Sequence, residues 1–293
     1  MLGKLFKYEW KGFRFPLMIM LIVLAGTTAL ACGVILSINP RYDDAFRGFS
    51  VSSLILSLLM YYFGIIGCSL GVMLVIAVRF YKTCYSDNGY LTHTLPVSTQ
   101  KILNVKIISS FLTVMLMTLA TVATVFIILN LGLNHIISIA IAEEGYTNLH
   151  DIEEARRAIY EEISSVFTGF KDVFGISFGL YIAYMIFYYI IAVFSNVVTV
   201  LGCVSLGQLY AKHRIIGAII AYFVVQFILQ IFMRIAIIPM YGRMMSNIGG
   251  HEKYTIFGFL SPTMNLTLLF MLIMAVAMYF INLHMMTKKL NLE

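Results

Sequence analysis

The residues of this chain that could carry chemistry are few and scattered. Its six histidines stand at positions 93, 135, 150, 213, 251 and 284, and no spacing among them suits a shared metal ion. No G-x-x-x-x-G-K-[ST] loop occurs, so the chain has no P-loop for a nucleoside triphosphate. We therefore expect no catalytic residue, no metal site and no cofactor in this chain, and no enzymatic activity of its own.

Polar side chains within apolar stretches are the remaining candidates. A stripe with four-residue steps comprises Tyr222, Gln226, Gln230 and Arg234. These four side chains share one helical face. Exposing their polar groups to lipid would cost free energy, so the stripe is expected to line a cavity or a subunit interface. Arg234 could instead extend to the headgroups. Tyr184 and Tyr188 form a similar pair, for which hydrogen bonds between helices are the alternative.

Composition identifies the elements that position these residues. The 293 residues are 60% hydrophobic and only 12% charged, with a mean hydropathy of +0.90. Soluble domains carry about 25% charged residues, so this chain is expected to be an all-α integral membrane protein. Its four cysteines show no disulfide pattern.

Six stretches reach the roughly 20 apolar residues that a bilayer requires. Their predicted bounds are residues 15–38, 51–78, 102–130, 173–206, 215–240 and 262–286. Together they predict a single transmembrane domain over residues 1–293. The second stretch has a seam suited to close helix packing, made of Ser53, Ser57, Tyr61, Gly64, Cys68 and Gly71.

The charges predict the orientation. Segments on the side of both termini carry twelve Lys and Arg against three acids, a net charge of +9. Segments on the other side carry seven Lys and Arg against eleven acids, a net charge of −4. The positive-inside rule therefore predicts six spans with both termini in the cytoplasm. Because orientation explains the basic pI, we expect no nucleic-acid partner.

Three shorter segments have their own patterns. Residues 1–14 alternate apolar and basic side chains, which predicts either an interfacial helix on anionic lipid or a flank that only sets orientation. This segment is expected to enter the first span near Phe15 and Pro16. Ser261 and Pro262 predict the start of the last span, with residues 254–260 as a separate short element in the outer leaflet.

The segment 131–172 lies on the predicted outer side and contains an amphipathic helix. Its apolar positions recur every three or four residues, at Ile152, Ala155, Ile159, Ile163, Val166 and Phe167. The apolar face could rest on the membrane, on the ends of the spans or on a second copy. A structural cap over the outer mouth is the expected role, and a gate or substrate lid is the alternative.

The loop 79–101 is expected to face the cytoplasm, because its basic residues outnumber the one acid, Asp87. The run from Asp87 to Gly89 predicts a turn. A short helix with two i,i+4 pairs follows, formed by Tyr90 with Thr94 and Leu91 with Leu95. Exposed aromatic and leucine side chains of this kind suit a protein interface.

The segment RFYKTCYSDNGYLTHTLPVSTQKILNVK at 79–106 resembles the loop between spans two and three of type-2 ABC-transporter permeases from Gram-positive bacteria. The resemblance implies a coupling helix that docks on a separate ATPase. Tyr90, Leu91, Thr94 and Leu95 would then dock, Pro96 would end the helix and Ser98 would cap the next span. Residues 208–214 would make a second contact.

The resemblance further implies a location in the bacterial cell membrane and a set of partners. Two ATPase subunits would carry ATP and Mg²⁺, and a second copy or a related permease would complete the path through membrane lipid. The expected function is the permease subunit of an ATP-driven exporter for an amphipathic drug, antimicrobial peptide or lipid. The alternatives are an antimicrobial sensing or immunity module without net transport and a secondary carrier, which the lack of Asp and Glu in the predicted spans disfavours.

Overall fold

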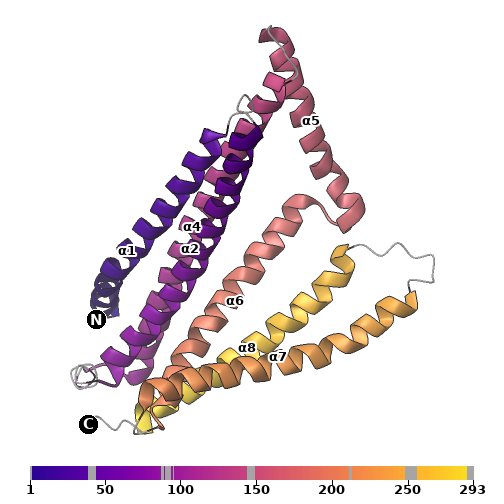
Figure 1. Cartoon of the computed structure of the whole chain (residues 1–293). Helices are drawn as coiled ribbons and strands as arrows, with labels where there is room; N and C mark the ends of the chain where they lie inside the picture. Colours follow the sequence, from indigo (N-terminus) through magenta and orange to yellow (C-terminus); the bar gives the residue numbers. More distant parts are fainter. Residues whose placement is uncertain are drawn as a thin grey trace. The chain divides into compact units, whose positions relative to one another are not determined.

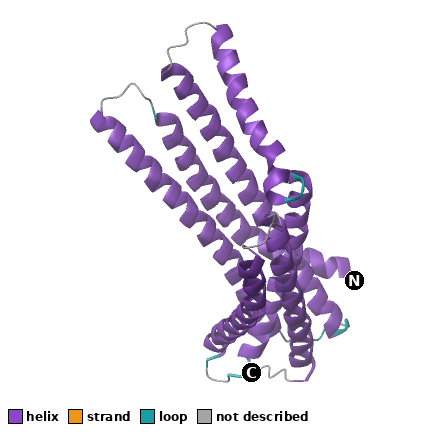
Figure 2. Ribbon diagram, turned by 90° about the vertical axis from the view of Figure 1, so that its right-hand side faces the viewer, coloured by secondary structure: helices purple, strands orange, loops and turns teal. Residues whose placement is uncertain are grey.

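The fold of the chain is helical throughout its described part. The computed structural model describes residues 2–38, 44–86, 89, 94, 96–143, 149–210, 213–247 and 256–288. The helices in chain order are α1 (Leu2–Ser37), α2 (Asp44–Cys84), α4 (Thr99–Glu143), α5 (Leu149–Phe174), α6 (Phe178–Gly207), α7 (Arg214–Asn247) and α8 (Ile256–Lys288) (Figure 1). No strand occurs among the described residues (Figure 2).

Six of these helices, all except α5, are long and apolar enough to cross a membrane. This finding confirms the prediction of six apolar spans and marks the chain as a multi-pass membrane protein. The physical reason is that hydrocarbon offers no partner for a backbone polar group, so each crossing segment satisfies its N–H and C=O groups within its own helix.

The N-terminal segment is helical and continuous with the first span, while its predicted place at the membrane interface stays a prediction. Helix α1 runs unbroken from Leu2 to Ser37 with Pro16 inside it. A proline inside a helix removes one hydrogen bond and crowds the carbonyl four residues earlier. Tertiary contacts offset this cost, because Glu9 and Phe13 on the inward face are 5% and 4% exposed.

Several helices extend beyond the predicted spans. Helix α2 continues to Cys84, so the loop after it begins six residues later than expected from residue 79, and α4 extends past residue 130 to Glu143. Helix α8 begins at Ile256, which places Pro262 inside the helix and removes the expected start at Ser261. Hydropathy locates the part of a helix that lies in lipid, whereas helices continue beyond it wherever polar residues are solvated or paired.

Helix α5 confirms that the segment 131–172 contains a helix. It spans 26 residues, and its charged side chains at 153, 154, 156, 157, 161, 162, 171 and 172 are exposed. The helix ends at Phe174, and the next residue, Gly175, has a φ of 83°, which only glycine readily adopts. The Gly175 N–H donates to the Lys171 carbonyl at 2.8 Å. Phe170 and Phe174 at this end stack at 3.9 Å between ring centroids.

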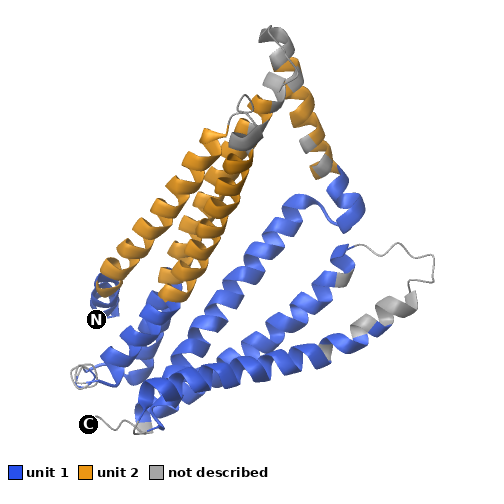
Figure 3. Cartoon of the chain, viewed as in Figure 1, with its two compact units in different colours: residues 1–11, 73–112, 169–293 blue, residues 12–72, 113–168 orange. Residues whose placement is uncertain are grey.

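Two compact units divide the chain (Figure 3). Unit 1 comprises residues 1–11, 73–112 and 169–293, and unit 2 comprises residues 12–72 and 113–168. Each unit therefore combines segments that are far apart in sequence.

Unit 2 is held together by the predicted seam of small residues on α2. The Tyr61 hydroxyl lies 2.9 Å from the Thr124 hydroxyl of α4, and Cys68 is 4% exposed. A Cβ atom added at Gly64 would lie 3.0 Å from the Thr27 hydroxyl oxygen of α1. The absence of a side chain at Gly64 thus lets α1 approach α2 closely, as the seam predicted.

The core of unit 1 is the second half of α6, which packs against both α7 and α8. Its buried residues are Val193, Ser195, Val197 to Ser205 and Gly207. Two glycines permit this packing. A Cβ at Gly202 would lie 2.9 Å from the Met278 Cβ of α8, and a Cβ at Gly207 would lie 2.5 Å from the Ala218 backbone nitrogen of α7.

Gly207→Ala is therefore expected to lower the free energy of unfolding by about 1–3 kcal/mol, because α7 backbone atoms must move to admit the methyl group. Gly179→Ala on the same helix is the matched control, since a Cβ there meets nothing within 4 Å. Denaturant titration in mixed micelles measures both variants. Equal stability of the two variants would contradict the proposed close approach of α6 and α7.

Candidate functional site

The connection between α2 and α4, residues 85–98, is the region that the sequence singled out. Gly89 donates its N–H to the Ser86 carbonyl at 2.6 Å, while Asp87 and Asn88 of the predicted turn lie outside the described residues. Among the predicted docking residues, Thr94 is exposed, whereas Tyr90, Leu91 and Leu95 lie outside the described residues. The docking helix therefore stays a prediction.

Helix α4 starts where the sequence predicted. Pro96 and Ser98 are exposed, and the Ser98 carbonyl accepts backbone N–H groups from Lys101 at 2.9 Å and Ile102 at 3.2 Å. Thr99 is the first helical residue, so Ser98 occupies the N-cap position. The end of the connection is thereby fixed to α4.

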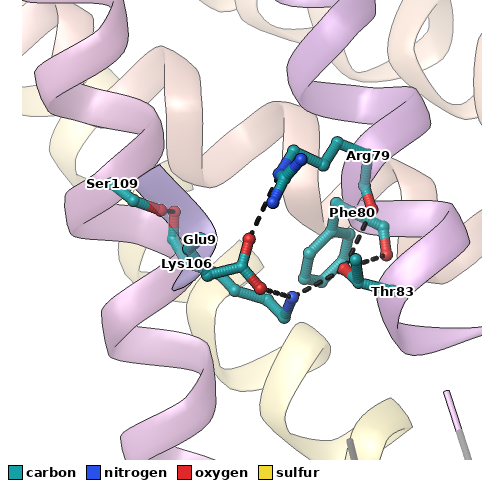
Figure 4. Close-up of polar contacts among 6 residues, drawn as sticks. All are labelled: Glu9, Arg79, Phe80, Thr83, Lys106 and Ser109. Carbon is teal, nitrogen blue, oxygen red and sulfur yellow. Dashed lines mark hydrogen bonds and ion pairs between the residues drawn. The ribbon is translucent and has the colours of Figure 1, made fainter. Parts of the chain in front are cut away.

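A buried ion-pair cluster lies at the base of this connection (Figure 4). The Glu9 carboxylate of α1 accepts from Lys106 Nζ of α4 at 2.6 Å and from Arg79 Nε of α2 at 3.2 Å. The side chains of Lys106 and Glu9 are 5% and 6% exposed, and that of Arg79 is 20% exposed. Three helices that are remote in sequence therefore meet at one carboxylate.

Thr83 completes this cluster on α2. Lys106 Nζ donates to the Thr83 hydroxyl at 2.6 Å, and the hydroxyl donates to the Arg79 carbonyl at 2.8 Å (Figure 4). The buried ammonium thus has both a charged and a neutral acceptor, as a desolvated cation requires. We call Glu9, Arg79, Thr83 and Lys106 the ion-pair cluster.

A second polar chain begins at the first residue after α2. The Tyr85 hydroxyl donates to Ser205 Oγ of α6 at 2.7 Å, and Ser205 Oγ donates to Asn282 Oδ1 of α8 at 2.5 Å. All three residues are buried, and the Phe80 ring lies edge-on to Tyr85 at 5.9 Å. Burial raises the pKa of the Tyr85 phenol, which therefore remains a donor at neutral pH.

These two arrangements fix the start of the connection within unit 1. Tyr85 follows α2 directly, and the hydrogen-bond chain that it begins reaches α6 at Ser205 and α8 at Asn282. Thr83 and Lys106 link α2 with α4, and Glu9 links these helices with α1. A displacement of the connection therefore acts on several helices at once. The described residues of the site show no arrangement suited to bond chemistry.

Tyr85→Phe is expected to lower the free energy of unfolding by about 1 kcal/mol, because Ser205 loses a buried donor. Tyr81→Phe on α2 is the matched control, since the described part of the structure gives the Tyr81 hydroxyl no hydrogen-bond partner. Both variants are measured by denaturant titration in mixed micelles. A Tyr85→Phe effect no larger than that of Tyr81→Phe would show that the chain to Ser205 adds no stability.

The predicted polar stripe on α7 is placed near the surface of unit 1. Tyr222 and Gln226 are half-buried, while Gln230 and Arg234 are exposed. On α6, the Tyr184 hydroxyl donates to Asn265 Oδ1 of α8 at 2.8 Å, and Tyr188 is half-buried. The structure thus brings Tyr184 against α8, whereas a cavity or subunit interface at the stripe stays a prediction.

An open groove adjoins the start of α4. Its volume is about 870 Å³, and its lining consists of Ser98, Thr99, Gln100, Phe280, Ile281, Leu283, His284, Met285 and Thr287. The groove lies between α4 and the last turns of α8. Within the described residues, no three His, Cys, Asp or Glu side chains gather as a metal site would need.

The sequence analysis missed the ion-pair cluster. Glu9 is the only acidic residue before position 43, and Lys106 is the only charged residue between positions 102 and 130. An isolated acid and an isolated base in otherwise basic and apolar segments are a usable signal, because each needs a partner when it is buried.

Compared with protein-family models, curated proteins and solved structures, the chain gives no match.

Proposed function

We propose that this chain is the membrane subunit of an ATP-driven exporter whose ATPase is a separate protein. The observation that carries the proposal is the fixation of the α2–α4 connection in the buried polar core of unit 1. Its sequence resembles the coupling segment of type-2 ABC permeases, and its base joins α1, α2, α4, α6 and α8 through short hydrogen bonds.

The mechanical requirement for such a subunit is that a push on the connection changes the packing of the spans. A loop joined flexibly to its helices would absorb the push. Here Lys106 lies eight residues after Ser98, and Tyr85 is the first residue after α2, so both ends enter buried hydrogen-bonded contacts almost at once. ATP shifts the equilibrium between two conformations only if the ATPase contacts them differently, so the proposal requires that the ATPase contact at this connection differ between the two.

The proposed substrate is amphipathic, such as a drug, an antimicrobial peptide or a lipid. The stripe on α7 offers a hydroxyl, two amides and one cation among the apolar residues between positions 215 and 240. Such a surface suits a molecule with both apolar and polar parts. The proposed location is the bacterial cell membrane, and the proposed complex holds two ATPase subunits and a second copy of this chain or a related permease.

Purification of the tagged chain from its native membranes tests the proposal. We expect an ATPase to co-purify, with one ATPase per copy of this chain if a second copy completes the complex and two if a related permease does, and to hydrolyse Mg-ATP in the complex. Uptake of substrate by inverted vesicles then separates an exporter from a sensing module, which would hydrolyse ATP without net transport. Purification with no ATPase partner would contradict the proposal and favour a secondary carrier.

A further inference from the structure

The first turns of α1 present three lysines and a tyrosine on one exposed face. Lys4, Lys7 and Lys11 are exposed, and Tyr8 between them is 72% exposed. At about 100° per residue, the four side chains fall within an arc of about 100°. We call this set the basic face of α1, and all of it belongs to unit 1 (Figure 3).

The charge of this face is uncompensated because the one nearby acid is turned inward. Glu9 is the only acidic residue before position 43, and its carboxylate is bound by Lys106 and Arg79. Within the described part of the chain, none of the three lysines has an ion-pair partner. The ion-pair cluster therefore leaves the basic face with three positive charges.

The length of α1 determines where this face lies. Its 36 residues extend about 54 Å at 1.5 Å per residue, whereas the hydrocarbon core is about 30 Å thick. The apolar stretch begins near Phe15, so Lys11 and Lys7 lie about 6 and 12 Å before it along the helix axis. That range matches the depth of the phospholipid headgroups, where tyrosine is also favoured.

From this charge, position and composition we propose that the basic face of α1 binds anionic phospholipid headgroups. The lysine ammonium groups supply the attraction to the lipid phosphates, and Tyr8 places its ring beside the glycerol region. Because α1 continues without a break from these turns into the apolar stretch, it would bind lipid along one side. This differs from a helix that lies flat on the membrane.

The single tryptophan of the chain provides a direct probe of this lipid contact. Trp10 is half-buried on the same turns and stacks on Phe6 with ring centroids 6.0 Å apart. The full chain is placed in bilayers of equal parts phosphatidylglycerol and phosphatidylcholine, with bromine on the acyl chains of one lipid or the other. Bromine quenches tryptophan only at short range, so the ratio of the two quenching values reports the local lipid composition.

The wild-type chain is expected to be quenched at least about twofold more by brominated phosphatidylglycerol, since each lysine near the surface favours anionic lipid. Lys4→Gln with Lys7→Gln and Lys11→Gln should bring the ratio to one, whereas the matched Lys→Arg triple variant should preserve it. About 1 M salt, where the Debye length is about 3 Å, should reduce the wild-type ratio. Equal quenching by the two brominated lipids in the wild type would overturn the proposal, and it is the result expected if an acidic protein were the partner. An unchanged ratio in the Gln variant would also overturn it.

Discussion

Lys106→Met is expected to lower the free energy of unfolding by about 3–5 kcal/mol, because it leaves a buried carboxylate short of its closest partner. Glu9 would retain only Arg79, which is 3.2 Å away and more exposed than Lys106. Thr83 would also lose the donor that binds its hydroxyl at 2.6 Å. Denaturant titration in mixed micelles provides the measurement.

Two comparisons make this prediction specific to the ion pair. Lys101→Met removes a lysine from the exposed surface of the same helix and should change stability by less than about 0.5 kcal/mol. Combining Lys106→Met with Glu9→Gln removes the buried carboxylate that has lost its closest partner, so the double variant should be more stable than Lys106→Met alone. A loss no larger than that of Lys101→Met would refute the stabilising role of the cluster.

Leu91→Asp combined with Leu95→Asp is expected to abolish the stimulation of ATP hydrolysis by the proposed partner. A carboxylate placed in an apolar contact removes the attraction between the two proteins at that contact. Each hot-spot residue contributes about 2 kcal/mol or more to the binding free energy. The assay compares ATP hydrolysis by the complex in vesicles with and without substrate. The matched control, Leu91→Met with Leu95→Met, keeps the apolar surface and should retain stimulation.

The stability of the aspartate variant separates coupling from folding. The docking assignment predicts that the unfolding midpoint of this variant equals that of the wild type. Stimulation that survives in this variant would rule out the assigned docking residues while leaving the fold untouched.

The sequence predicts well those features that depend on hydropathy and periodicity. Six apolar helices, the helix in the segment 131–172 and the α2 seam at Gly64 and Cys68 are all present. These features follow from local rules: apolar length selects a span, spacing of three or four residues selects a helix face, and small residues permit close approach.

Features that depend on a partner far away in sequence could not be predicted. The predicted spans end beside charged residues, whereas helices α1 and α2 run through Glu9 and Arg79, which pair with each other and, at Glu9, with Lys106. The pairing of Tyr85 with Ser205 crosses 120 positions and leaves no local pattern. The stripe on α7 has the spacing of one helical face, and what lies against that face stays a prediction.

The central claim is that a separate ATPase docks on the α2–α4 connection. Cross-linking from position 94 tests this claim most directly. Thr94 is an exposed residue of the connection, and Ser164 on α5 is an equally exposed control. A photoreactive amino acid is placed at either position, and adducts are identified after irradiation of native membranes. The account predicts an adduct between position 94 and an ATPase subunit and none from position 164. An ATPase that co-purifies with the chain but never cross-links to position 94 would contradict it.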